Sequence, residues 1–217
     1  MSMICSVCRL QLQSGAPIDE MAVDRALARL SDGGWPADEC AILRGIGSLS
    51  ARAQSVGARL ALLWALTEQA SGAHDFDELP PVRPEIRDVL ATFCKDEQGR
   101  PLLREQLWQI SLAHGASLAV CALSDQGAIG VDVESKDRLP HRAHDIANRL
   151  FSETEQAQLA RSPVWEEAFI HIWTRKEALG KMLGTGLRAD PSQLDTTRYP
   201  DRFLEYEWEG HLICICQ

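Results

Sequence analysis

The sequence has no long apolar run, no excess of positive charge and no basic leader. No stretch approaches the roughly 18 apolar residues of a membrane-spanning helix. The net charge of −9 argues against a general nucleic-acid or membrane-surface binder. The opening residues, MSMICSVCRLQL, lack the basic segment of a secretory signal. We therefore expect a cytoplasmic protein that binds neither nucleic acid nor membrane.

A disulfide framework is also lacking, because the seven cysteines are odd in number and scattered along the chain. Cys5 and Cys8 form a lone C-x-x-C, without the further ligands that a zinc or redox site needs. Cys214 and Cys216 lie close together near the C-terminus. We interpret all seven as reduced thiols, partly buried in strands.

The chain has 217 residues, of which 45% are hydrophobic, enough for one large domain or two packed halves. Periodicity predicts an α+β protein with a break near residue 105, dividing it into residues 1–105 and 106–217. The apolar run SLAVCAL, the turn SDQG and the strand AIGVDVES follow one another, so we expect a hairpin. In the first half we predict a strand at 2–12, helices at 18–31 and 48–69, and a helix that begins at Pro84.

The second half carries clear signals of helix ends. FSETEQAQL, residues 151–159, has a capping box, with Ser152 at the N-cap and Glu155 three residues later. Pro163 starts another helix, which Gly184 ends. The tail, RFLEYEWEGHLICICQ, predicts two strands joined at Gly210.

Two carboxylates lie side by side on the strand AIGVDVES, residues 128–135. Alternation places Ile129, Val131 and Val133 on one face, and Gly130, Asp132 and Glu134 on the other. Like charges at i and i+2 repel each other, so they need a cation, a proton or open water.

The helix that follows contains WTRKEALGK, in which Trp173, Glu177 and Lys181 are spaced i, i+4, i+8 and share one side. Taken alone, this is a surface Glu–Lys pair. Together with the strand, it supplies three carboxylates and a lysine. Hard oxygen ligands suit Mg²⁺ or Mn²⁺, and a nearby lysine suits a phosphate. The pattern therefore predicts metal-assisted chemistry at phosphorus.

GVDVE and WTRKEALGK, about 45 residues apart, resemble the two signature motifs of the 4′-phosphopantetheinyl transferases. FSETE and GRPLL resemble further family segments, and RAQSVGARLALL at 52–63 resembles a first-half helix that meets coenzyme A. The likeness is to the longer, pseudo-dimeric branch of surfactin-type and AcpT-type enzymes. It implies two similar α+β halves packed as an intramolecular pseudo-dimer, which would let one chain, as a monomer, form the site.

The resemblance also implies the reaction and the roles of single residues. Coenzyme A would donate its 4′-phosphopantetheine arm to a serine of an apo-carrier protein, acyl or peptidyl, and release 3′,5′-ADP. Asp132, Glu134 and Glu177 match the Mg²⁺ ligands, with Mn²⁺ as the alternative ion. Glu177 is also a candidate base for the serine proton, and Lys181 matches the lysine near the phosphate.

One segment departs from the family pattern. The family has Ser-His before the first motif, whereas SLAHGAS at 111–117 has Ala113 and His114. The resemblance gives His114 a role at the 3′-phosphate of coenzyme A, with one hydroxyl donor missing. Arg52, Arg59 and Arg100 are weaker carry-overs to coenzyme A, because isolated arginines are often solvated.

The carrier proteins that such transferases modify are usually acidic around the modified serine. We therefore expect a basic rim beside the site, although the net charge of the chain is negative. Two alternatives to the transferase stay open, namely a metal-dependent phosphodiesterase or nuclease and a non-catalytic coenzyme A-binding relative. The candidate rim residues are Arg138, His141, Arg142, Arg149, Arg175, Lys176, Lys181 and Arg188.

Overall fold

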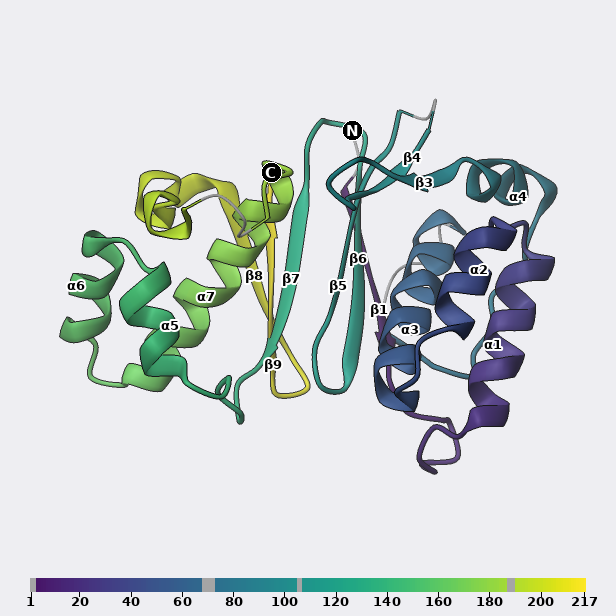
Figure 1. Ribbon diagram of the computed structural model, residues 1–217, viewed down its shortest axis with the longest axis horizontal. Coiled ribbons are helices and arrows are strands. Elements are labelled where there is room, and N and C mark those ends of the chain that lie inside the picture. The colour runs from purple at the N-terminus through teal and green to yellow at the C-terminus, as the bar shows by residue number, and fades with distance from the viewer. Residues whose placement is uncertain (1–2, 68–72, 105–106, 187–189) are drawn as a thin grey trace. The chain divides into compact units, whose positions relative to one another are not determined.

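The computed structural model describes residues 3–67, 73–104, 107–186 and 190–217. The chain forms two compact units, Met1–Gly127 and Ala128–Gln217. Both mix helices with antiparallel strands, so the predicted α+β class is confirmed (Figure 1). No helix in the described parts of the chain is both long and apolar enough to cross a membrane.

The first unit packs helices on a sheet with strand order β2-β1-β6-β5. β1 pairs antiparallel with β6 and parallel with β2, and β3 and β4 form a separate hairpin. The elements are β1 (Met3–Arg9), α1 (Glu20–Asp32), α2 (Ala37–Arg44), α3 (Leu49–Leu66), β2 (Ala73–Asp75), α4 (Pro84–Ala91), β3 (Phe93–Lys95), β4 (Pro101–Leu103), β5 (Gln109–His114) and β6 (Leu118–Ser124).

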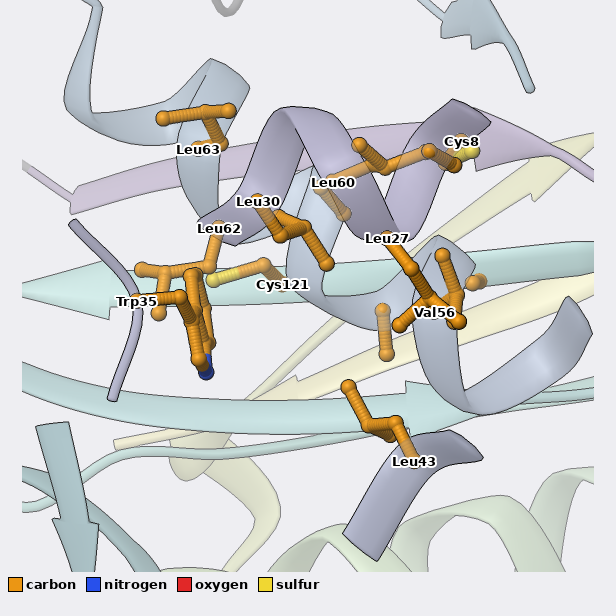
Figure 2. Close-up of a cluster of buried hydrophobic side chains, with 14 of the residues drawn as sticks. Cys8, Leu27, Leu30, Trp35, Leu43, Val56, Leu60, Leu62, Leu63 and Cys121 are labelled. Atoms are coloured by element: carbon orange, nitrogen blue, oxygen red, sulfur yellow. The ribbon is translucent and has the colours of Figure 1, made fainter. Parts of the chain in front are cut away.

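The core of the first unit is built around α3, which the sequence predicted at 48–69; residues 68–69 of that prediction lie outside the described residues. Val56 and Leu60 of α3 are fully buried, together with Leu27 and Leu30 of α1. Figure 2 shows these side chains gathered with Cys8 and Cys121 of the sheet. Burial of such side chains contributes about 1.5–3 kcal/mol each relative to exposure.

The second unit packs α7 against a three-stranded antiparallel sheet of order β7-β9-β8 (Figure 1). Its elements are β7 (Gly130–Ser135), α5 (Ala143–Leu150), α6 (Glu153–Arg161), α7 (Trp165–Met182), β8 (Phe203–Trp208) and β9 (His211–Cys216), with short 3₁₀ turns η1 (Pro191–Gln193), η2 (Thr196–Arg198) and η3 (Pro200–Arg202). The capping box is confirmed in both directions. Ser152 Oγ accepts from the Glu155 N–H at 3.1 Å, and Glu155 Oε2 accepts from the Ser152 N–H at 2.7 Å.

The two units repeat one topology that the sequence does not show as a repeat. In each unit, the first strand pairs antiparallel with the last strand, which pairs antiparallel with the strand before it. The trios are β1-β6-β5 and β7-β9-β8. In each unit an 18-residue helix, α3 or α7, follows the first strand in sequence and packs on the sheet. This supports the expectation of two similar halves.

Two long-range predictions were wrong. β6 and β7 do not form a hairpin, because β6 pairs with β1 and β5 while β7 pairs with β9. The chain divides between residues 127 and 128 rather than near 105, which itself lies outside the described residues. The hairpin and the boundary were wrong for the same physical reason. β5 and β6 complete the sheet of β1, so they belong to the first unit, and the boundary falls after β6.

Candidate metal and phosphate site

A glycine lets α7 lie directly on β7. A Cβ on Gly130 would lie 1.9 Å from the carbonyl oxygen of Ala178, far inside any real contact. Because side chains alternate along a strand, Asp132 and Glu134 share the Gly130 face and are directed to the same helix. The predicted pairing of strand and helix is therefore present within the second unit, and it explains why a glycine stands beside two carboxylates.

Asp132 is buried, with 7% of its surface exposed, and its two oxygens differ. Oδ1 accepts a hydrogen bond from Lys181 Nζ at 2.8 Å, and the same ammonium donates to the Val131 carbonyl at 3.0 Å. Oδ2 is buried and has no hydrogen-bond partner among the described residues. A buried acceptor left unpaired costs about 1–3 kcal/mol, so this oxygen is a natural position for a ligand atom.

Glu134 is held by an indole from α7. Trp173 Nε1 donates to Glu134 Oε1 at 2.7 Å. Burial and the charge of Asp132 raise the pKa of Glu134 to about 7, and Glu177 adds to this, while the Trp173 bond and Lys181 oppose it. The sequence predicted only that Trp173 shares one side of the helix with Glu177 and Lys181. Its spacing from Glu177 is the signal that places it beside the carboxylates.

Glu177 completes the group from the same side of α7. Burial and the charge of Asp132 raise the pKa of Glu177 to about 7, and Lys181 opposes the shift. Asp132 raises and Lys181 lowers the pKa values of both Glu134 and Glu177. The structure thus places the three predicted metal ligands and the predicted lysine within electrostatic range of one another.

This donor set fits a hard divalent cation. Asp132 has a buried oxygen without a partner among the described residues, and burial together with the charge of Asp132 raises the pKa values of Glu134 and Glu177. Mg²⁺ and Mn²⁺ prefer oxygen ligands and favour the ionised carboxylates. Lys181 contacts Asp132 in this structure, so a contact with phosphate stays a prediction.

The residues predicted to bind coenzyme A other than Lys181 lie in the first unit, and three of them have partners there. Arg52 donates to the Ile46 carbonyl and to Glu20, both at 2.9 Å. Arg59 is paired with the buried Glu39, which also binds Lys95. Arg100 pairs with Asp96 at 3.2 Å.

His114 is exposed at the end of β5, opposite Ala119 of β6. The ion pairs and hydrogen bonds of Arg52, Arg59 and Arg100 show that these arginines support local structure. The roles of the three arginines and of His114 toward coenzyme A stay predictions.

The predicted basic rim is only partly present. Lys176 is completely buried, and Arg175 is bound by Glu205 through two hydrogen bonds, so neither offers an unpaired charge. Arg188 lies outside the described residues. Near α5, His141 and Arg149 are exposed and border a hollow of about 320 Å³.

The structure also shows a second cluster that sequence reasoning missed. Ligand atoms of Glu167, His171 and Glu207 lie within 4.8 Å of one another on the surface of the second unit. Lys136 Nζ already binds Glu207 at 2.6 Å, and His171 Nδ1 lies 3.1 Å from Glu205. Lys136 therefore supplies positive charge beside Glu207, and Glu205 is a hydrogen-bond partner of His171.

Comparison with known proteins matches residues 128–216 to the 4′-phosphopantetheinyl transferase superfamily. The 4′-phosphopantetheinyl transferase AcpT of Salmonella typhimurium is 38% identical over 92 residues, covering 41% of this chain and 47% of the relative. A 4′-phosphopantetheinyl transferase of Bacillus subtilis is 30% identical over 128 residues, covering 57% and 55%. The transferase Sfp of Bacillus subtilis is 31% identical over 98 residues, covering 44% and 42%.

The second unit is thus a domain of the 4′-phosphopantetheinyl transferase superfamily, and the predicted family is confirmed. The relatives also confirm the AcpT- and Sfp-type branch. The matched region contains Asp132, Glu134, Glu177 and Lys181. The chain spans about half the length of the curated relatives it matches.

Proposed function

We propose that this protein transfers the 4′-phosphopantetheine arm of coenzyme A to a serine of an apo-carrier protein, with Mg²⁺ or Mn²⁺ as the metal. One observation carries the proposal. Asp132 on β7 has a buried carboxylate oxygen without a partner among the described residues, Lys181 of α7 binds its other oxygen, and the charge of Asp132 acts on Glu134 of β7 and Glu177 of α7. The superfamily match over the same residues supports the assignment.

The side chains of the site have separate tasks in this reaction. Asp132, Glu134 and Glu177 would hold the metal. When bound, the metal supplies charge stabilisation at the pyrophosphate. The serine Oγ forms a bond to the β-phosphorus of coenzyme A, the bond from that phosphorus to 3′,5′-ADP breaks, and the serine proton passes to Glu177 directly or through water. Trp173 keeps Glu134 oriented through its N–H.

The carrier protein is expected to meet the surface of α5. The hollow there has the exposed side chains of Arg149 and His141 beside the apolar side chains of Ile146 and Leu150. Arg142 lies on the same surface, although Asp145 pairs with it at 2.7 Å. Such a combination suits an acidic helix with an apolar stripe, and rim charges mainly raise the association rate.

A test uses the leaving group. The protein is incubated with coenzyme A, Mg²⁺ and an apo-carrier, and free 3′,5′-ADP is quantified by chromatography. We expect release only when metal and carrier are both present. A non-catalytic relative would bind coenzyme A without release. A phosphodiesterase would cleave coenzyme A or nucleic acid without needing the carrier. Either result would contradict the proposal.

A further inference from the structure

A fully buried lysine lies next to Glu177 in the sequence. Lys176 has no exposed surface, yet its ammonium is completely engaged. Nζ contacts Glu155 Oε2 at 2.7 Å, donates to the Pro191 carbonyl at 2.9 Å and also donates to the Leu194 carbonyl. A buried ammonium has three donors and needs three acceptors, and Lys176 finds all of them.

Glu155 is equally buried and equally well satisfied. Oε2 accepts from the Ser152 N–H at 2.7 Å as part of the capping box of α6. Oε1 accepts from the N–H of Thr196 at 2.9 Å and from its hydroxyl at 2.7 Å. The Glu155–Lys176 pair therefore joins α7 to the start of α6 and to the segment containing η1 and η2.

α7 is held at two places around its circumference. On one side, the Ala178 carbonyl lies close against Gly130 of β7, and on another, Lys176 is bound by Glu155. Lys176 and Glu177 are consecutive, so their side chains leave the helix about 100° apart. Any rotation of α7 that changes the position of Lys176 also changes the direction of Glu177.

We infer that the Glu155–Lys176 pair is a positioning pair, which fixes the rotation of α7 so that Glu177 is directed at Asp132 and Glu134. The inference rests on the proposed function of that site. A helix with its side chains is about 10–12 Å wide, so a rotation of about 10° moves a side-chain tip by about 1 Å. A displacement of about 1 Å at a reacting group can lower a rate about 100-fold.

The test compares Mn²⁺ binding in variants of the whole chain. Replacing one partner alone would leave an uncompensated buried charge and risk unfolding, so both are neutralised in Glu155→Gln/Lys176→Met. Mn²⁺ affinity without coenzyme A is measured by electron paramagnetic resonance, and Tm is measured on the same samples. We expect the double variant to bind Mn²⁺ about tenfold more weakly or worse, as for lost positioning groups at metal sites.

A matched control separates positioning from general destabilisation. Leu159→Ala removes a buried side chain of α6 that packs in the same apolar cluster as Phe169 of α7, without removing a polar contact. We expect it to lower Tm while Mn²⁺ affinity stays within about twofold of wild type. Wild-type affinity in the double variant, or equal weakening in Leu159→Ala, would overturn the inference.

If the double variant does not fold, a second variant tests the positioning role. Thr196→Val removes only the hydroxyl that binds Glu155, and we expect weaker Mn²⁺ binding in the same direction; unchanged affinity would overturn the inference. The transfer assay distinguishes failure of the proposed function from failure of the positioning role. If the wild-type chain transfers nothing, the proposed function is contradicted. If the wild-type chain does transfer and the double variant equals it in kcat and Mn²⁺ affinity, only the positioning role is contradicted.

Discussion

Replacing Asp132 with alanine should nearly abolish transfer and leave the second unit folded. Asp132 supplies a buried oxygen without a partner among the described residues, and after burial its charge is the next cause of the raised pKa values of Glu134 and Glu177. Losing a metal ligand should lower kcat by about 100-fold or more, since even indirect supports of a metal site are worth about 10–100-fold.

Although activity falls, the free energy of unfolding of Asp132→Ala should rise or stay unchanged. Removing Asp132 ends the cost of an unpaired buried acceptor, about 1–3 kcal/mol. It also removes the ion pair with Lys181, which is 29% exposed and therefore worth about 0–1 kcal/mol. Lys181 keeps its bond to the Val131 carbonyl at 3.0 Å. In the absence of metal, the free energy of unfolding of the variant should therefore equal that of wild type or exceed it by up to about 3 kcal/mol, with an equal or higher Tm.

The assay pairs two measurements on one preparation. Transfer is followed at saturating Mg²⁺ and coenzyme A, and unfolding is followed by circular dichroism. Asp201→Ala, which removes an exposed carboxylate of η3, serves as the control and should change neither quantity. Transfer by Asp132→Ala above about a tenth of wild type would refute the metal assignment. A large loss of Tm would refute the account of the unpaired oxygen.

Three further predictions concern Glu177, His114 and the pH dependence of stability. Glu177→Gln should lower kcat on the order of 100-fold or more, and a change confined to KM for coenzyme A would make Glu177 a binding residue only. His114→Ala should lower kcat/KM for coenzyme A selectively, with little change for dephospho-coenzyme A, and equal losses for both donors would contradict this. The pKa of Glu134 and Glu177 is raised in the folded state to about 7 from 4.5, so the stability that they contribute is complete below about pH 4.5 and is lost as pH rises through about 7. The Tm of the metal-free protein should therefore fall over this range more steeply than that of Glu134→Gln/Glu177→Gln, and parallel curves would contradict the shifts.

Short-range patterns predicted much of the fold. Alternation placed Asp132 and Glu134 on one face of a strand, and the capping box placed the start of α6 at Ser152, because both signals are contained in a few neighbouring residues. Strand partners were not predictable in this way. β7 pairs with β9 from the end of the chain, and an apolar strand pattern carries no information on which distant strand completes its hydrogen bonds.

The sequence pattern named residues for the candidate site but not all of their contacts. Helical spacing put Trp173, Glu177 and Lys181 on one side of α7, yet the bond from Trp173 to Glu134 depends on how deeply the helix sits on Gly130. Lys176 was predicted at a basic rim and is buried instead. Its burial comes from the segment around η1 and η2 and from Glu155, whose positions the sequence pattern of α7 does not contain.

The central claim is a covalent transfer to a carrier serine, and intact-mass spectrometry of the carrier tests it most directly. A panel of apo-acyl and apo-peptidyl carriers is incubated with the protein, coenzyme A and Mg²⁺, alongside carriers whose modified serine is replaced by alanine. The account predicts that at least one carrier gains the mass of a single phosphopantetheine group, that the serine-to-alanine carrier gains none, and that chelation of the metal or Asp132→Ala stops the gain. No gain on any carrier, or an undiminished gain with Asp132→Ala, would contradict it.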